Sequence, residues 1–300
     1  MDGPARGASL VIEPACPADA LSPARRLDQA VVRLERFDPA LSARTGLWRA
    51  QRRWLTAGVA ASATAVFTAP QAFTLALEGA LAVVFALLLA VRLLAIRHVL
   101  TAPRQAGAVL PPEPDLRSAP QEISAHVPVY TVLIALYREA EIVPQLLAAL
   151  DALDYPAAKL EIIFALEEDD LDTWDALAAQ RLPAHMRVVR VPDGCPRTKP
   201  RALCHALTFA RGDYVVVYDA EDLPDRDQLT RAIAAFAAAG VGNLGCLQAS
   251  LAVNNARQSW LTAQFAIEYT ALFDAVLPAL ARYRLPVPLG GTSNHFPGIR

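Results

Sequence analysis

A short run of β-branched and aromatic residues, Tyr214–Tyr218, constrains the fold of this chain more than any other stretch. Such a run predicts a strand that is buried on both faces of a parallel sheet. The run ends at three carboxylates, Asp219, Glu221 and Asp222, and Pro224 then prevents the strand from continuing. Ligands of open α/β sheets bind at the carboxyl ends of the strands, so these acids are candidate oxygen ligands for Mg²⁺ or Mn²⁺. A solvated acidic turn is the alternative interpretation.

Strands and helices alternate along the C-terminal part of the chain. Apolar runs predict the strands, and apolar residues at helical spacing predict the helices between them. The pattern predicts an α/β domain in which a mostly parallel sheet is flanked by helices. Neither G-x-G-x-x-G after the first strand nor G-x-x-x-x-G-K-[ST] occurs, which disfavours a dinucleotide-binding Rossmann domain and a P-loop ATPase. The expected strands are residues 129–136, 160–166, 186–191, 214–218 and 244–252, and the expected helices are residues 139–153, 172–180, 200–211 and 225–239.

Polar clusters follow three of the expected strands, at residues 137–139, 167–170 and 219–222. In a parallel sheet these three clusters lie at the same edge. A basic segment, residues 197–201, opens the helix before the fourth strand. Cations are unfavourable at the N-terminus of a helix unless an anion binds there. Basic residues that face an acidic, metal-binding turn would suit a diphosphate, and solvated surface charges are the alternative for the two arginines.

The N-terminal third contains a long apolar stretch in which Glu78 is the only charged residue from position 54 to position 91. The chain as a whole is 54% hydrophobic with a mean hydropathy of +0.28, which is high for a purely soluble protein. The stretch is nearly long enough for two passes of about 20 residues each, and Pro70 falls near its middle. We therefore predict a transmembrane helical hairpin within residues 54–97, with both basic flanks in the cytoplasm. One long kinked span is the alternative.

The other segments have simpler signatures. Residues 1–50 are predicted to be mostly disordered, with a short amphipathic helix near 25–37, and residues 101–128 form a Pro-rich linker. The soluble domain then covers residues 129–300. A net charge of −2 argues against a nucleic-acid partner. The four cysteines form no C-x-x-C pair, which indicates neither a zinc site nor a disulfide framework.

From about residue 129 to residue 300, the strand-end motifs resemble the processive, membrane-associated family 2 glycosyltransferases, which are relatives of cellulose and hyaluronan synthases and have the GT-A fold. Residues 219–222 resemble the D-x-D metal motif of that family, with either Glu221 or Asp222 as its second acid. Residues 198–203 resemble the segment near the diphosphate, although Cys204 stands where Asn is usual. The resemblance implies the following donor- and acceptor-binding residues: Tyr137 and Glu139 at the uridine, Glu167 or Asp169 at the uracil, Lys199 and Arg201 near the diphosphate, and Gly291 and Thr292 at the sugar and acceptor pocket.

The resemblance implies an inverting, metal-dependent hexosyltransferase. It would move a sugar from a UDP-sugar to a saccharide or lipid acceptor in polysaccharide synthesis. A multi-pass protein of a bacterial-type inner membrane, with a cytoplasmic catalytic domain, would suit this activity. The family takes its general base from a Thr-Glu-Asp motif that would follow Arg300, so we expect an incomplete domain with little turnover of its own.

Two other functions remain open from the sequence. The first alternative is an inactive, transferase-like membrane protein that binds a nucleotide or a partner without turnover. A nucleotidyltransferase would share the α/β sheet, but it would require a Gly-rich loop after the first strand, and residues 137–139 do not form one.

Overall fold

A computed structural model of the chain describes residues 22–39, 42, 46–101, 127–240 and 244–298. The chain divides into two compact units. The first comprises Met1–Val31, Leu110–Leu251 and Pro288–Arg300, and the second comprises Val32–Val109 and Ala252–Val287. Most of the predicted disordered segment and of the predicted linker falls on residues 1–21 and 102–126, outside the described residues.

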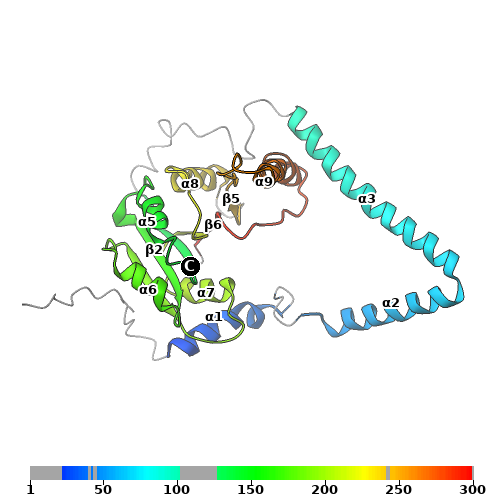
Figure 1. Ribbon diagram of the computed structural model, residues 1–300, viewed down its shortest axis with the longest axis horizontal. Coiled ribbons are helices and arrows are strands. Elements are labelled where there is room, and N and C mark those ends of the chain that lie inside the picture. The colour runs from blue at the N-terminus through cyan, green and yellow to red at the C-terminus, as the bar shows by residue number, and fades with distance from the viewer. Residues whose placement is uncertain (1–21, 40–41, 43–45, 102–126, 241–243, 299–300) are drawn as a thin grey trace, which may run out of the picture. The chain divides into compact units, whose positions relative to one another are not determined.

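The first unit is built on one mixed sheet of six strands in the order β3-β2-β1-β4-β6-β5 (Figure 1). Strands β1 to β4 run parallel to one another, while β6 runs antiparallel to both β4 and β5. This topology confirms the predicted α/β class with a mostly parallel sheet. The strands are β1 (Tyr130–Leu136), β2 (Leu160–Glu167), β3 (Met186–Val191), β4 (Tyr214–Tyr218), β5 (Leu247–Gln248) and β6 (Asn294–Pro297).

Helices cover both faces of this sheet, which explains why its central strands read as uninterrupted apolar runs. On one face, α5 (Val143–Asp151), α6 (Leu171–Ala178) and α8 (Gln228–Ala239) contribute to the larger core around Val132 and Val216. On the other face, α7 (Lys199–Leu207) and α1 (Pro23–Phe37) contribute to a second core. Leu27 of α1 and Leu133 of β1 are both buried in that second core. The bounds of α1, Pro23–Phe37, confirm the helix expected near residues 25–37. Full burial of such side chains stabilises a fold by about 1.5–3 kcal/mol each.

Several predicted elements of this unit are shorter than expected, including the helices predicted at 200–211 and 225–239, which are α7 (Lys199–Leu207) and α8 (Gln228–Ala239). The predicted helix over 139–153 begins at Val143, because the backbone turns at the end of β1, where Arg138 has a φ of 59° and the Glu139 N–H donates to Thr173 Oγ1. The predicted strand over 244–252 is reduced to the two residues of β5. Only Leu247 and Gln248 pair with β6, opposite His295 and Asn294.

In the second unit, α2 (Arg49–Thr68) and α3 (Pro70–Thr101) meet at Ala69, close to the predicted turn. Among the described residues, only α3 is long and apolar enough to cross a membrane. One such helix is weak evidence for a membrane protein, so the predicted two-span hairpin stays a prediction. The side chains of both helices are exposed along almost their whole length.

The second unit also contains a continuous helix from Trp260 to Arg282, which consists of α9 (Trp260–Thr270), the π-helical segment η3 (Ala271–Val276) and α10 (Leu277–Arg282). Pro278 stands at the start of α10 and has no N–H to donate, and the wider π turn immediately precedes it. Segments η3 and α10 contact α3.

Candidate functional site

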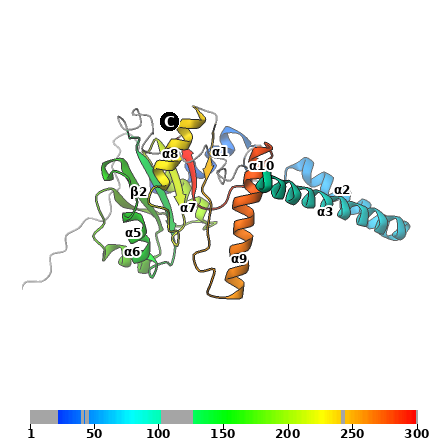
Figure 2. The same cartoon turned by 90° about the horizontal axis from the view of Figure 1, so that it is seen from above.

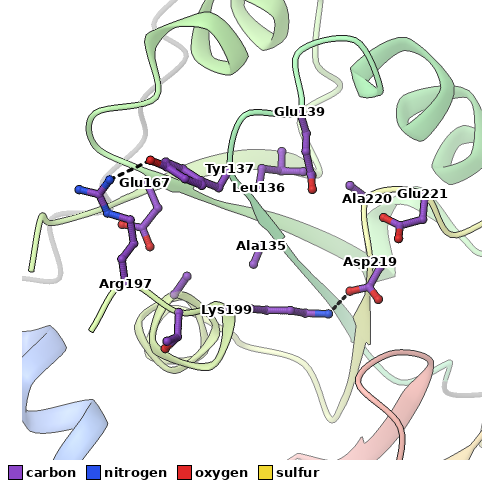
Figure 3. A pocket seen from close by; sticks show the side chains of 12 residues that line it. Ala135, Leu136, Tyr137, Glu139, Glu167, Arg197, Lys199, Asp219, Ala220 and Glu221 are labelled. Atoms are coloured by element: carbon purple, nitrogen blue, oxygen red, sulfur yellow. Dashed lines mark hydrogen bonds and ion pairs between the residues drawn. The ribbon is translucent and has the colours of Figure 1, made fainter. Parts of the chain in front are cut away.

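A pocket of about 290 Å³ opens at the carboxyl ends of β1, β2 and β4 in the first unit (Figure 3). The N-terminus of α7 and its preceding loop close the opposite wall. The sheet therefore brings the three predicted strand-end clusters and the predicted basic segment to one place. The lining residues are Ala135, Leu136, Tyr137, Glu139, Glu167, Arg197, Thr198, Lys199, Ala202, Asp219, Ala220 and Glu221.

Lys199 and Asp219 face each other at one end of the pocket (Figure 3). Lys199 is the first residue of α7, and its Nζ donates to Asp219 Oδ1 and, at 3.1 Å, to the carbonyl of Gly291. Burial lowers the pKa of Lys199, whereas the nearby carboxylates of Asp222 and Glu221 act in the opposite direction. The cation at this helix N-terminus is thus balanced by acids of the β4 turn.

The three acids of the β4 turn do not share one orientation. Asp219 and Glu221 line the pocket, whereas the Asp222 carboxylate points back and accepts a hydrogen bond of 2.8 Å from the Asp219 backbone N–H. Thr292 Oγ1 donates to Asp222 and accepts from the Asp219 N–H at 3.0 Å. Burial raises the pKa of Asp222, and the hydrogen bond from Thr292 opposes that shift. The structure thus uses Asp222 and Thr292 to hold the turn that presents Asp219.

Glu139 reaches into the pocket from the end of β1, across from Glu221 (Figure 3). Its Oε2 is buried and has no hydrogen-bond partner among the described residues. Burial raises the pKa of this carboxyl group, repulsion from Glu221 and Asp170 adds to the shift, and Lys199 opposes it. An unpartnered acid beside a second acid is a place where a cation or a hydrogen-bond donor of a ligand would be stabilised.

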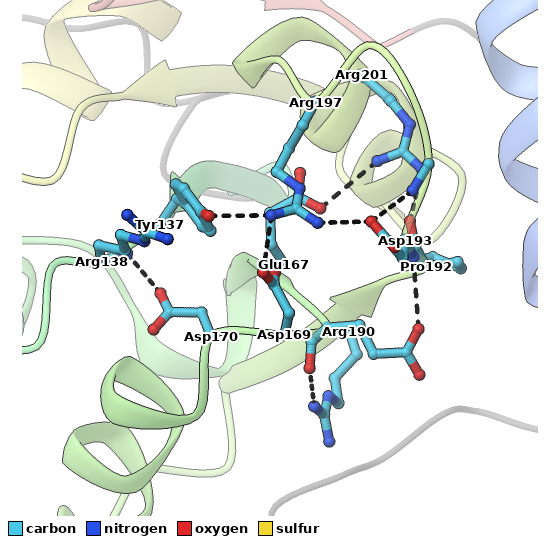
Figure 4. A network of polar contacts seen from close by, with 12 residues as sticks. Tyr137, Arg138, Glu167, Asp169, Asp170, Arg190, Pro192, Asp193, Arg197 and Arg201 are labelled. Atoms are coloured by element: carbon cyan, nitrogen blue, oxygen red, sulfur yellow. Dashed lines mark hydrogen bonds and ion pairs between the residues drawn. The ribbon is translucent and has the colours of Figure 1, made fainter.

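A network of polar contacts centred on Arg197 forms the other end of the pocket (Figure 4). Arg197 Nη1 donates to the Tyr137 hydroxyl at 2.9 Å and to Asp169 Oδ2 at 2.7 Å, and Nη2 donates to Asp193 Oδ1 at 2.5 Å. The guanidinium carbons of Arg138 and Arg197 lie 5.0 and 5.3 Å from the centre of the Tyr137 ring. The aromatic ring is therefore held in place by cation–π contacts and a hydrogen bond.

Glu167 and Arg201 form a buried ion pair with 3.5 Å between Arg201 Nη1 and Glu167 Oε2. Burial raises the pKa of Glu167 even though Arg201 lowers it. Arg201 Nη2 also donates to the Pro192 carbonyl at 2.5 Å, and a Cβ at Gly194 would come within 2.6 Å of that nitrogen. Glu167 lines the pocket, whereas Arg201 does not and instead fastens the loop that follows β3.

Several contact residues were not among the predicted site residues. Arg197 belongs to the basic segment that the sequence marked, but its role at Tyr137 depends on contacts across 60 positions of the chain. Asp170 caps the N-terminus of α6 by accepting from Thr173 N at 3.2 Å, and it also accepts from Arg138 N at 2.5 Å. No sequence signal identifies Asp193, which pairs with Arg197 from an exposed loop.

Two of the three predicted metal ligands, Asp219 and Glu221, line the pocket, and Asp222 does not. Among the described residues, no group of three or more His, Cys, Asp or Glu side chains is close enough to hold an ion by itself. Asp219 and Glu221 are hard oxygen donors, as Mg²⁺ and Mn²⁺ require, and Mg²⁺ is usually held by one or two carboxylates together with the phosphates of a substrate. The two acids fit an ion of that kind, and Asp222, engaged in the turn, is not oriented with them.

A comparison with models of protein families matches residues 128–294 with the family described as "Glycosyltransferase like family 2". The match covers more than half of the chain, so the chain belongs to this family.

Solved structures also resemble the chain. The mannosyltransferase PcManGT from Pyrobaculum calidifontis, in complex with GDP-Man and Mn²⁺, is 24% identical; the match covers 71% of this chain and 54% of that one, with a TM-score of 0.48. TarS 1–349 of S. aureus in complex with UDP-GlcNAc is 18% identical and matches over 57% of this chain and 59% of its own length, with a TM-score of 0.34. The chain thus spans little more than half of the length of these proteins. A search of curated proteins found no match.

Proposed function

We propose that this chain carries the donor site of an inverting glycosyltransferase that moves a sugar from a UDP-sugar to a saccharide or lipid acceptor in polysaccharide synthesis. One observation supports this most directly: Lys199, Asp219 and Glu221 line one end of the pocket whose other end is formed by Tyr137 and Arg197. Cationic and metal-binding groups at one end suit a diphosphate, and an aromatic ring with polar neighbours at the other end suits a nucleotide base. Membership of the glycosyltransferase family favours the same function.

The base of the donor would bind at the Tyr137 end. Tyr137 offers a ring that is fixed by Arg138 and Arg197, and Asp169 offers an exposed carboxylate that accepts hydrogen bonds. A carboxylate can accept from the N–H of uracil. Glu167 is buried and already forms an ion pair with Arg201, so Asp169 is the better candidate for a hydrogen bond to the base.

The diphosphate would bind between Lys199 and the acids of the β4 turn. A divalent ion on Asp219 and Glu221 would neutralise charge on the leaving diphosphate when it is bound. Lys199, released from Asp219, would donate to a phosphate oxygen and stabilise the charge that develops there during transfer. Gly291 and Thr292 would keep the opposite wall in place, since they contact Lys199 and the β4 turn.

We also propose that α3 spans a membrane with its basic end in the cytoplasm. Its window of highest hydropathy averages 2.6, and Arg92 and Arg97 follow the apolar run. Basic residues at the end of a span favour the cytoplasmic side. An enzyme held there would meet nucleotide sugars in the cytoplasm and acceptors at the membrane.

Calorimetric titration of UDP with and without Mn²⁺ tests the donor site. Replacing Asp219 by Asn removes a charged ligand at nearly constant volume, and the Mn²⁺-dependent part of the UDP affinity should be lost. Asp225→Asn is the matched control, because Asp225 is exposed and lies outside the pocket. Unchanged Mn²⁺-dependent affinity in Asp219→Asn would refute the proposal.

A further inference from the structure

The part of α1 up to Val31 belongs to the first unit and packs on the face of the sheet that carries α7, away from α5 and α6 (Figure 2). Leu27 is the only buried residue of α1, and the partly buried Val31 packs against the same core. The guanidinium carbon of Arg26 lies 5.1 Å from the centre of the Phe209 ring, just beyond the end of α7. Apolar packing and a cation–π contact therefore connect α1 to the surroundings of α7.

The core that contains Leu27 extends to the wall of the donor pocket. Leu27 belongs to the same cluster of buried side chains as Ala202 of α7, and Ala202 also lines the pocket. Ala135 of β1 likewise packs against this core and lines the pocket. The apolar side chains that pack with α1 are therefore continuous with those that form the pocket wall.

The position of α7 decides where the ammonium group of Lys199 lies. Lys199 is the first residue of α7 and stands about one turn before Ala202. Its Nζ extends across the pocket to Asp219 Oδ1 and, at 3.1 Å, to the carbonyl of Gly291. Hydrogen bonds weaken steeply when their distance or angle leaves a narrow range, so a small shift of α7 would separate Lys199 from both acceptors.

A buried histidine of α7, His205, lies beside the contact with α1. Its ring centre is 5.3 Å from that of Phe209, and the two rings meet edge to face at 78°. Burial lowers the pKa of His205 to about 4, and Arg26 adds to that shift, whereas a hydrogen bond with the backbone of Arg190 opposes it. The imidazole is therefore neutral near pH 7 and does not repel Arg26, which lies over the same Phe209 ring.

We propose that α1 is a positioning element of the donor site, in which Leu27 and Arg26 hold α7 so that Lys199 stays opposite Asp219. The inference rests on the proposed role of Lys199 at the diphosphate. Leu27 and Arg26 are positioning residues, because they do not line the pocket and act through α7. If α1 separates from α7, the sheet keeps its larger core on the other face, so the donor site should weaken while the domain stays folded.

The lysines of the full chain, studied in detergent, give a test that needs no ligand. Lys199 and Lys159 are the only lysines in the sequence, so labelling of lysine Cε with ¹³C gives two magnetic-resonance signals, and Lys199→Met identifies the signal of Lys199. Leu27→Asp places a charge in the second core and should separate α1 from α7. The signal of Lys199 should then move toward the shift of a lysine in an unfolded chain, while the signal of Lys159 stays in place. Leu34→Asp is the matched control, because it makes the same change at an exposed position of α1 and should move neither signal.

An unmoved signal of Lys199 in Leu27→Asp would overturn the proposal. Movement of both signals would show a general loss of folding, and a milder variant, Arg26→Gln, would then decide. Arg26→Gln removes only the cation–π contact and should move the signal of Lys199 in the same direction by a smaller amount. In that case, movement of both signals or of neither signal in Arg26→Gln would overturn the proposal.

Calorimetric titrations of Mn²⁺ alone and of UDP at saturating Mn²⁺ separate positioning from general stabilisation. Loss of the contact between Lys199 and Asp219 should raise the affinity of Leu27→Asp for Mn²⁺ alone by up to about fivefold. It should lower the affinity for UDP about three- to tenfold. The loss of UDP affinity should vanish when Leu27→Asp is combined with Lys199→Met, because both changes act through the same contact.

The pattern of the two affinities distinguishes the possible failures. Weaker binding of both ligands by Leu27→Asp would show general destabilisation and overturn the proposal, as would an undiminished loss of UDP affinity in the combined variant. A moved signal of Lys199 with unchanged UDP affinity would support the positioning of Lys199 by α1 and refute the proposed role of Lys199 at the diphosphate.

Discussion

Lys199 is placed so that removal of its charge should change the affinities for a metal ion and for a diphosphate in opposite directions. Its Nζ donates to Asp219 Oδ1, so a cation that binds Asp219 must compete with it. The same ammonium group would be the donor to a phosphate oxygen once the ion is bound. We therefore predict that Lys199→Met binds Mn²⁺ alone more tightly than the unchanged protein and binds UDP with Mn²⁺ more weakly.

The solvent exposure of Lys199 and Asp219 sets the expected size of the changes in UDP and Mn²⁺ affinity. A hydrogen bond to a charged group contributes about 1.5–3 kcal/mol. The Lys199 side chain is 34% exposed, which screens its charge, so the lower half of that range, about 1.5–2 kcal/mol, is appropriate. At about 1.4 kcal/mol per tenfold, UDP should bind about 10–30-fold more weakly. The competing ion pair with Asp219 is about one-third exposed and contributes at most about 1 kcal/mol, so the affinity for Mn²⁺ alone should rise up to about fivefold.

Calorimetric titrations of Mn²⁺ alone and of UDP at saturating Mn²⁺ measure both effects on one sample. Lys159→Met is the matched control, because it removes the same charge at the start of β2, on the opposite edge of the sheet. The control should leave both affinities unchanged. If Lys199→Met left UDP affinity unchanged, Lys199 would not contact the diphosphate. If Lys199→Met weakened Mn²⁺ binding, the inference that Lys199 competes with the ion for Asp219 would be refuted.

Three other predictions concern groups around the pocket and beneath it. Glu161→Ala should lower the free energy of unfolding by about 3–5 kcal/mol, because it removes the buried carboxylate that pairs with Arg187, whose side chain is only 11% exposed. Denaturant titration in detergent measures this, and a loss below about 1 kcal/mol would contradict it. Burial lowers the pKa of His295 from its usual 6.5 to about 4, so its neutral form stabilises the fold above pH 6.5 and this contribution is lost as the pH falls toward 4. The same titration between these pH values should show a flatter slope for His295→Gln, and an unchanged slope would exclude His295 as its source. Asp222→Asn should lower stability but keep Mn²⁺-dependent UDP binding, and a loss of binding as large as that of Asp219→Asn would make Asp222 a metal ligand.

The strands were predictable from the sequence because burial on both faces leaves a direct signature. The predicted bounds of 186–191 and 214–218 are those of β3 and β4. The predicted strand at 244–252 failed for a non-local reason, since the length of a strand is set by its pairing with a neighbour, and only Leu247 and Gln248 pair with β6. A run of apolar residues in the sequence therefore does not determine how long this strand is.

Part of the pocket was also predictable, because strand ends meet at one edge of a parallel sheet. Tyr137, Glu139, Lys199 and Asp219 all line the pocket, as the positions of the polar clusters implied. The orientation of Asp222 was not predictable, because it depends on Thr292, which lies 70 residues farther along the chain. A local pattern identifies three acids in a turn but not which of them faces the ligand.

The exposure of the ion pairs separates binding residues from structural ones at this edge of the sheet. Arg197 pairs with Asp169 at side-chain exposures of 31% and 45%, and Lys199 with Asp219 at 34% and 32%. Such pairs contribute about 0–1 kcal/mol, so a ligand can replace either partner at small cost. Arg201 and Glu167 are exposed by only 9% and 4%, and separating a buried pair costs about 3–5 kcal/mol. The proposed donor would therefore engage Lys199 with its diphosphate, or Arg197 at its base, before it drew Arg201 away from Glu167, and Arg201 would act on the ligand only through the loop after β3 that it holds.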